Sequence, residues 1–210
     1  MTTEDLIVQR PAKPKQLVLL FHGVGSSARD LAPLGEALAP HLPDAAIVSV
    51  QAPGASGRGW QWFSVQGVTE ADRPARVAAA MPGFVQGVMR WQQACAVGPA
   101  QTTLIGFSQG AIMALESTQL DNPPAARVTG LSGRFAQPPR IAHASVRTHL
   151  MHGDADAVMP VRGAVDALAQ LQSLGAVATL DRFSGLGHGV DRRVIDAIVR
   201  RLGDALPASS

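Results

Sequence analysis

A serine between two glycines stands where an expected strand meets an expected helix. Residues 106–110 read Gly-Phe-Ser-Gln-Gly, after a strand-like run at 102–105 and before an apolar run at 111–115. This G-x-S-x-G pattern is typical of a nucleophile elbow, a sharp turn that lifts a serine hydroxyl above a sheet. Among 21 glycines the pattern also arises by chance, and the other interpretation is a helix with a serine cap. The flanking elements favour the elbow, with Ser108 as nucleophile.

Such a serine needs a histidine to accept its proton and a carboxylate to orient that histidine. In the α/β-hydrolase arrangement the acid follows the serine and the histidine comes last. Asp154 and Asp156 follow an apolar stretch, and His188 lies in a glycine-rich loop before the last expected helix. The order is therefore satisfied. The residues alone do not separate the two aspartates, since either could instead accept hydrogen bonds within its own turn.

Most other histidines lack such a setting. His41, His143 and His149 stand in no turn signature and are expected to be surface or structural residues. His152 is expected to orient its loop. His188 is favoured as the base because the glycines around it let the backbone approach a ligand.

Four motifs in the chain together resemble those of a known protein family. They are Phe-His-Gly-Val-Gly at 21–25, the serine motif at 106–110, His-Gly-Asp-Ala-Asp at 152–156 with Val158 and Pro160 after it, and Gly187-His188. They span residues 21–190 and resemble the small carboxylesterase, phospholipase and acyl-protein thioesterase family. Residues 62–67 and 73–76 are similar to a bacterial cytosolic esterase branch of that family.

The resemblance implies residue roles. In the family's H-G-D-x-D block the second acid belongs to the catalytic triad, which implies Asp156. The resemblance also implies that the backbone amides of Val24 and Gln109 form the oxyanion hole. Two such donors, one from the elbow and one from a glycine-rich loop after an earlier strand, suit a tetrahedral oxyanion. The expected reaction is acyl transfer through Ser108, with His188 as general base.

Two departures from the family pattern bear on the substrate. The family often has proline where this chain has Ala157, and an acidic residue where it has Ser64. Both leave the triad intact, but because of them the family's substrate preference carries over to this chain less directly. In the glycine-rich loop 51–74, Trp62 and Phe63 are expected to line a shallow acyl groove, with core packing as the alternative.

The elements that position these residues alternate along the chain. Strands are expected near 16–21, 45–50, 102–106, 126–131, 147–152 and 176–182, and helices near 30–40, 74–96, 109–120, 161–174 and 189–204. The alternation predicts a single α/β-hydrolase domain over 1–210, with a mostly parallel sheet, helices on both faces and no separate cap domain. Pro82 and Gly83 are expected to break or kink the second helix. The ends near 1–5 and 206–210 are expected to be flexible.

Composition excludes several classes of function. The net charge of +2 is small, and the chain shows neither aromatics interleaved with its basic residues nor a phosphate-binding loop, so no nucleic-acid partner is expected. No metal-spaced Cys/His cluster occurs, so no metal or other cofactor is expected. No apolar run is long enough for stable membrane insertion. The single Cys95 excludes an internal disulfide and favours a cytoplasmic location.

The sequence therefore predicts a cofactor-free serine carboxylesterase acting on short to medium acyl esters or thioesters of small molecules. An acylated protein stays open as a substrate, and so does a homodimer. Two alternatives remain at this point: a hydrolase of another acyl bond, such as a lactone or peptide, and a catalytically silent binding protein on the same fold.

Overall fold

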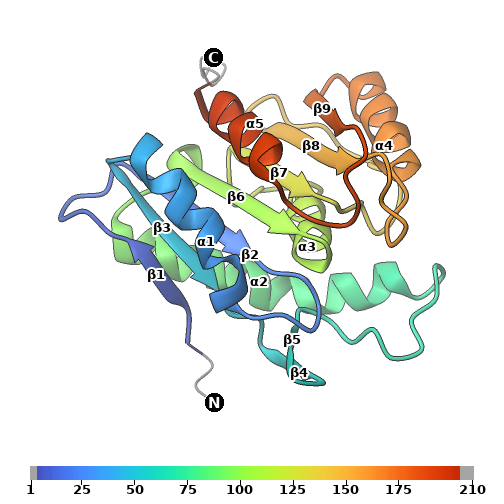
Figure 1. The fold of residues 1–210 in the computed structure, drawn as a ribbon, viewed down its shortest axis with the longest axis horizontal. Helices are drawn as coiled ribbons and strands as arrows, with labels where there is room; N and C mark the ends of the chain where they lie inside the picture. The colour runs from blue at the N-terminus through green and yellow to red at the C-terminus, as the bar shows by residue number, and fades with distance from the viewer. Residues whose placement is uncertain (1–3, 204–210) are drawn as a thin grey trace.

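A seven-stranded sheet runs through the computed structural model, which describes residues 4–203 (Figure 1). The sheet order is β1-β3-β2-β6-β7-β8-β9, and every neighbouring pair is parallel except β1 with β3. The strands are β1 Leu6–Gln9, β2 Gln16–Phe21, β3 Ala45–Val50, β6 Thr102–Phe107, β7 Arg127–Leu131, β8 Arg147–Gly153 and β9 Val177–Phe183. A separate antiparallel pair joins β4 Gly54–Ser56 to β5 Gly59–Gln61.

Helices cover both faces of the sheet (Figure 1). They are α1 Ala28–Leu38, α2 Arg73–Cys95, α3 Gln109–Ser117, α4 Arg162–Ser173 and α5 Arg192–Gly203, with short 3-10 turns at Ala39–His41 and Pro99–Gln101. The apolar sides of α1 and α5 pack into one core cluster, and those of α2, α3 and α4 pack into the other. The predicted α/β fold with a mostly parallel sheet is confirmed.

The central strands form because both of their faces are buried. Along β2, Val18 and Leu20 belong to one core cluster, while Leu17, Leu19 and Phe21 belong to the other. A parallel strand covered on both sides reads as a continuous apolar run, because successive side chains point to opposite faces. This is the signal by which the sequence located five of the parallel strands to within a few residues, whereas β9, located equally well, is only partly buried.

The start of the described chain differs from expectation. The sequence did not predict β1, an antiparallel strand at the edge of the sheet. Just before it, Asp5 accepts hydrogen bonds from the Gln51 amide at 2.9 Å and from the Trp91 indole at 2.7 Å. These bonds attach a residue that the sequence assigned to a flexible end. The rest of the expected ends, 1–3 and 206–210, lies outside the described residues.

The second helix is not broken at its proline. Helix α2 runs from Arg73 to Cys95 with Pro82 inside it, so the expected break is wrong. Pro82 and Gly83 are both exposed. The carbonyl that loses its backbone donor to the proline therefore faces the solvent side, where water can bind it. Among residues 4–203 no helix has the length and apolarity needed to cross a membrane.

Candidate active site

A strained turn between β6 and α3 presents Ser108. Its φ of 53° and ψ of −113° lie in a region that residues with a side chain rarely adopt. The two glycines of the motif are required by close backbone contacts. A Cβ on Gly106 would lie 2.3 Å from the Gly110 oxygen, and a Cβ on Gly110 would lie 2.1 Å from the Phe21 oxygen. The turn is thus a packed elbow, not a serine-capped helix start.

The histidine and an aspartate reach this serine from neighbouring loops. Ser108 Oγ lies 3.0 Å from His188 Nε2, and His188 Nδ1 lies 2.8 Å from Asp156 Oδ2. The side chain of Asp156 is fully buried and that of His188 is 18% exposed. The imidazole ring also packs against Phe107, with the ring centres 5.0 Å apart. The structure therefore brings together the three residues that the sequence predicted for the triad.

The two candidate aspartates have different partners. Asp156 Oδ1 accepts hydrogen bonds from the amides of Val158 at 2.9 Å and Met159 at 2.8 Å, which leaves Oδ2 for His188. Burial raises the pKa of Asp156, but these hydrogen bonds outweigh burial and hold the pKa below its ordinary value. Asp154 instead accepts a hydrogen bond from the Gly185 amide at 2.7 Å. It joins the acid loop to the histidine loop without contacting the imidazole.

His152 fastens the turn that carries the acid. It is buried, and its Nε2 lies 2.6 Å from the Met159 carbonyl oxygen and 3.4 Å from Asp156 Oδ2. Because the carbonyl can only accept, Nε2 is the donor in that bond. This contact agrees with the expected role of His152 in orienting its loop.

The resemblance implies two backbone N–H groups for an oxyanion hole. They belong to Val24, in the loop after β2, and to Gln109, at the start of α3. Within the described part of the chain, neither N–H donates a hydrogen bond to another protein atom. The first N–H groups of a helix lack partners inside the helix, which explains the Gln109 amide. The loop of Val24 is held by β5, because the Gly25 amide donates to the Trp60 carbonyl at 2.8 Å.

His22 shapes the same loop. Its Nδ1 donates to the Gly23 carbonyl at 2.8 Å, so the unprotonated Nε2 accepts from the Ala52 amide at 3.1 Å. Burial lowers the pKa of His22, with smaller opposing effects from the Gly23 carbonyl and Asp30. The buried ring therefore favours its neutral form, in which one nitrogen donates and the other accepts.

Trp62 and Phe63 pack in the core, which corrects their expected place in an acyl groove. Each side chain is only 7% exposed. The Trp62 ring meets Phe21 and Phe84 edge-on, with ring centres 5.4 and 5.7 Å apart, and its Nε1 donates to the His22 carbonyl at 2.8 Å. The alternative of core packing is therefore the one that the structure supports.

The Gln109 side chain explains why these aromatics sit where they do. Its Oε1 accepts from the Trp62 amide at 2.8 Å, and its Nε2 donates to the Phe63 carbonyl at 2.7 Å. The elbow thereby holds the loop after β5 through a side chain that is itself buried. Sequence reasoning used Gln109 only for its backbone amide. No spacing in the sequence signals the side-chain contact, because its partners are backbone atoms.

Cys95 is buried in the structure, and this burial raises the pKa of its thiol. Among the described residues, no three side chains of His, Cys, Asp or Glu are grouped so that they could hold a metal ion.

Comparisons with known proteins find esterases and carboxylesterases among the proteins similar to this chain. The phospholipase/carboxylesterase family matches residues 3–203. Esterase YpfH of Escherichia coli strain K12 is 44% identical over 210 residues, which cover 99% of this chain and 90% of the relative. The crystal structure of esterase PE8 superposes with a TM-score of 0.83 at 32% identity, over 96% of this chain and 97% of that one. A Bacillus cereus carboxylesterase has a TM-score of 0.80 at 15% identity, over 94% and 92% of the two chains, and shows the shared fold.

Proposed function

We propose a reaction from the premise that this chain belongs to the phospholipase/carboxylesterase family of α/β-hydrolases. The family and its esterase relatives make the chain a hydrolase of carboxylic esters. We propose that hydrolysis proceeds through an acyl intermediate on Ser108, with His188 as general base and Asp156 as its orienting acid. The continuous hydrogen-bonded chain from Ser108 Oγ to Asp156 Oδ2, at the tip of a strained elbow, carries this proposal.

In the first half-reaction, Ser108 Oγ attacks the ester carbonyl carbon while its proton passes to His188 Nε2. A neutral imidazole with its proton on Nδ1 can accept at Nε2, and the Nδ1–H donates to Asp156. Asp156 then faces an imidazolium, and its lowered pKa means that it stays ionised there. The tetrahedral oxyanion lies against the N–H groups of Val24 and Gln109, whose lack of protein acceptors supports this role.

The intermediate collapses when the bond from carbon to the leaving oxygen breaks and His188 gives its proton to the departing alcohol. The acyl group then stays on Ser108 as an ester. A water molecule attacks that ester as His188 removes its proton, and the proton returns to Ser108 Oγ as the acid leaves. A thioester would follow the same steps with a thiol as leaving group, so small-molecule thioesters and acylated proteins belong to the same proposed chemistry.

We propose the cytoplasm as the place of reaction. The single cysteine is buried and unpaired, which suits a reducing compartment.

A covalent probe tests the proposed nucleophile. We expect a fluorophosphonate to attach to Ser108, as mapped by mass spectrometry, and Ser108→Ala to lose both the label and about 10⁶ in turnover of a p-nitrophenyl ester. Ser117→Ala, a buried serine of α3, is the matched control and should keep both. Retention of more than about a tenth of the turnover in Ser108→Ala, with the native circular dichroism spectrum, would contradict the acyl-serine mechanism.

A further inference from the structure

A cavity beside the acid loop has no role in the reaction as described so far. Its volume is about 370 Å³, and its walls include Glu70, Arg73, Arg134, Val158 and Met159. These residues come from the loop before α2, the first turn of α2, the segment after β7 and the segment between β8 and α4. The cavity is thus built from three separate stretches of chain, since the loop before α2 runs directly into its first turn.

The cavity adjoins the catalytic residues on two sides. Val158 and Met159 are the residues whose amides hold Asp156. On the other side, Gly133, the neighbour of Arg134, approaches the elbow so closely that a Cβ there would lie 3.2 Å from the Ser108 carbonyl oxygen. The walls of the cavity are thus continuous with the segments that carry Asp156 and pack against the elbow of Ser108.

Two arginines in the cavity share one carboxylate. Arg134 Nη2 donates to both oxygens of Glu70, at 2.8 and 2.7 Å, and Arg73 also donates to Glu70. The three side chains together carry a formal charge of +1. Each guanidinium has five N–H donors, so Glu70 occupies only part of the donor set. The group can accept a second anion or exchange Glu70 for one.

The exposures of these side chains favour exchange. The arginines are the more buried members, at 15% exposure for Arg73 and 33% for Arg134, whereas Glu70 is 73% exposed. A surface ion pair contributes little to stability, so an exposed carboxylate is released from it at small cost. The less exposed guanidinium groups gain more from a nearby anion than fully exposed ones would, because fewer water molecules solvate their charge.

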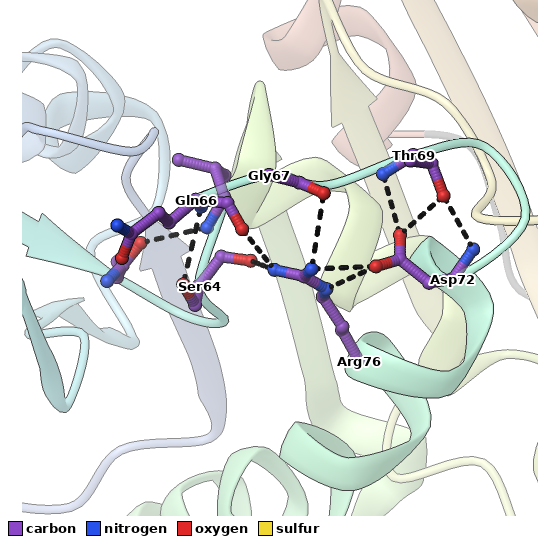
Figure 2. A network of polar contacts seen from close by, with 8 residues as sticks. Ser64, Gln66, Gly67, Thr69, Asp72 and Arg76 are labelled. Atoms are coloured by element: carbon purple, nitrogen blue, oxygen red, sulfur yellow. Dashed lines mark hydrogen bonds and ion pairs between the residues drawn. The ribbon is translucent and has the colours of Figure 1, made fainter.

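The loop that carries Glu70 is also held by a separate network of polar contacts (Figure 2). Arg76 Nη1 donates to the carbonyls of Ser64 at 2.9 Å and Gln66 at 2.8 Å, and Arg76 Nη2 lies 2.7 Å from Asp72 Oδ2. Asp72 in turn accepts from the Thr69 amide at 2.6 Å. This network lies within the loop and the first turns of α2, and Glu70 takes no part in it. The Glu70 side chain can therefore turn away while the cavity wall stays in place.

We propose that the cavity is a subsite for an ionised carboxylate of the substrate, bound by Arg134 and Arg73 in competition with Glu70. The planar fork of a guanidinium matches a carboxylate, which favours this anion. The substrates would be esters that carry a second, free carboxyl group, such as half-esters of dicarboxylic acids. The inference rests on the proposed esterase function and extends it to a substrate class.

The test compares charged and neutral esters of one carbon skeleton. We would measure kcat/KM by pH-stat at low ionic strength for monoethyl and diethyl esters of dicarboxylic acids from C4 to C8, which carry the charge on the acyl side. The second arm compares the 4-acetoxybutyrate ion with its neutral methyl ester. In this arm the charge lies on the alcohol side of the acetate ester. We expect the charged member of at least one arm to be preferred about 10-fold or more, since hydrogen bonds to charged groups commonly contribute that much.

Two variants should move this preference in opposite directions. Arg134→Gln should lower kcat/KM for the charged ester at least about 10-fold and change the neutral ester little. Glu70→Gln should raise kcat/KM for the charged ester several-fold, because it removes the competing carboxylate, and a purely structural role would not produce this gain. Arg192→Gln removes a charge from an 85%-exposed side chain on α5 and should leave both esters unchanged.

The outcomes separate the subsite from the esterase proposal. Equal kcat/KM for charged and neutral esters in the wild type overturns the subsite and leaves the esterase function standing. A Glu70→Gln variant that loses activity on both esters alike also overturns the subsite and leaves the esterase function standing. If neither ester is hydrolysed, the esterase proposal is at fault, and calorimetric binding of adipate then judges the subsite alone. Adipate must bind the wild type and lose at least about 10-fold in affinity in Arg134→Gln, or in Arg134→Lys if the glutamine variant does not fold.

Discussion

At the scale of single residues, the acid illustrates what the sequence leaves open. Asp154 and Asp156 stand two positions apart in one turn, and no rule of spacing distinguishes them. The resemblance implied Asp156, and the geometry agrees, since Asp156 contacts His188 while Asp154 binds the Gly185 amide. The difference lies in which way each side chain leaves the turn. That direction depends on tertiary contacts and is absent from a local pattern.

The two aspartates should therefore respond differently to the same substitution. We expect Asp156→Asn to lower turnover of a p-nitrophenyl ester by about 10⁴, because an amide favours the wrong imidazole tautomer. Asp154→Asn keeps an acceptor for the Gly185 amide, and we expect it to cost less than about 10-fold by comparison with that loss. The measurement is kcat for both purified variants. Equal losses, or a larger loss at 154, would overturn the assignment of the acid.

His22 should make the stability of the protein depend on pH. Burial holds its pKa below the ordinary value of 6.5 in the folded state. As the pH falls through that ordinary value, the unfolded chain binds a proton that the folded chain resists, so the free energy of unfolding falls. Above it both states are neutral and the effect disappears.

We expect urea unfolding to show this dependence at a single histidine. Between pH 7.5 and pH 5, the wild type should lose more unfolding free energy than His22→Asn does. His41→Asn, at an exposed histidine, should lose as much as the wild type. An unchanged dependence in His22→Asn would mean that the buried ring does not resist protonation.

At the scale of elements, the sequence was informative where burial is two-sided and uninformative where partners are distant. Five of the parallel strands were found because each is a nearly continuous run of buried residues, whereas β9 is only partly buried. The strands β1, β4 and β5 were missed because each is short and only partly buried, so no period of two stands out. Trp62 and Phe63 were misplaced for a related reason. Aromatic side chains in loops often line binding sites, but these two fill space between the sheet and α2.

The link between the elbow and the loop after β5 can be broken without touching the triad. Gln109→Met keeps the backbone amide and the approximate volume but leaves the Trp62 amide and the Phe63 carbonyl without their partner. We expect it to lower the unfolding free energy by about 2–6 kcal/mol, since each of the two buried unpaired groups costs about 1–3 kcal/mol. We also expect turnover to fall about 10-fold, because a shift near the proposed oxyanion donors would reduce their effect.

Gln119→Met is the matched control for that prediction. Gln119 is also buried and on the segment after α3, where its side chain holds the Arg140 amide at 2.6 Å and the Ile141 carbonyl at 3.1 Å. It lies at the opposite end of the helix from the elbow. The control should lose stability to a similar extent and keep its turnover. A similar loss of turnover in both variants would indicate general destabilisation.

At the scale of the whole molecule, the alternation of strands and helices was sufficient to predict the layers. The sequence did not reveal the strand order, and the antiparallel edge strand went unseen. Order depends on which strand pairs with which across many intervening residues. Local periodicity contains no such information.

The open architecture bears on acyl length. Residues 62–72, which connect β5 to α2, contain no helix or strand that could act as a cap. With Trp62 and Phe63 buried, the cavity beside the site has the charged side chains of Glu70, Arg73 and Arg134 in its walls, together with Val158, Met159, Pro160 and Gly163. A methylene gains its roughly 0.8 kcal/mol only when it leaves water, so long apolar chains gain little here.

We therefore expect kcat/KM on p-nitrophenyl esters to rise over the first few acyl carbons and then level off or fall. A panel from acetate to decanoate at equal detergent-free concentrations checks this. A steady rise to the longest chain would require a deep apolar tunnel and would contradict the reading of the enzyme as one for short to medium acyl groups.

The distance in sequence between Ser108 and His188 has a consequence during synthesis of the protein. Ser108 and His188 are 80 residues apart, and the histidine follows the last strand of the sheet. At ordinary rates of protein synthesis that interval lasts roughly 4–16 s. During it the ribosome carries Ser108 without the histidine that we propose as its base. The nascent chain therefore cannot acylate itself or attack cellular esters, and ester hydrolysis begins only once nearly all of the domain has been made.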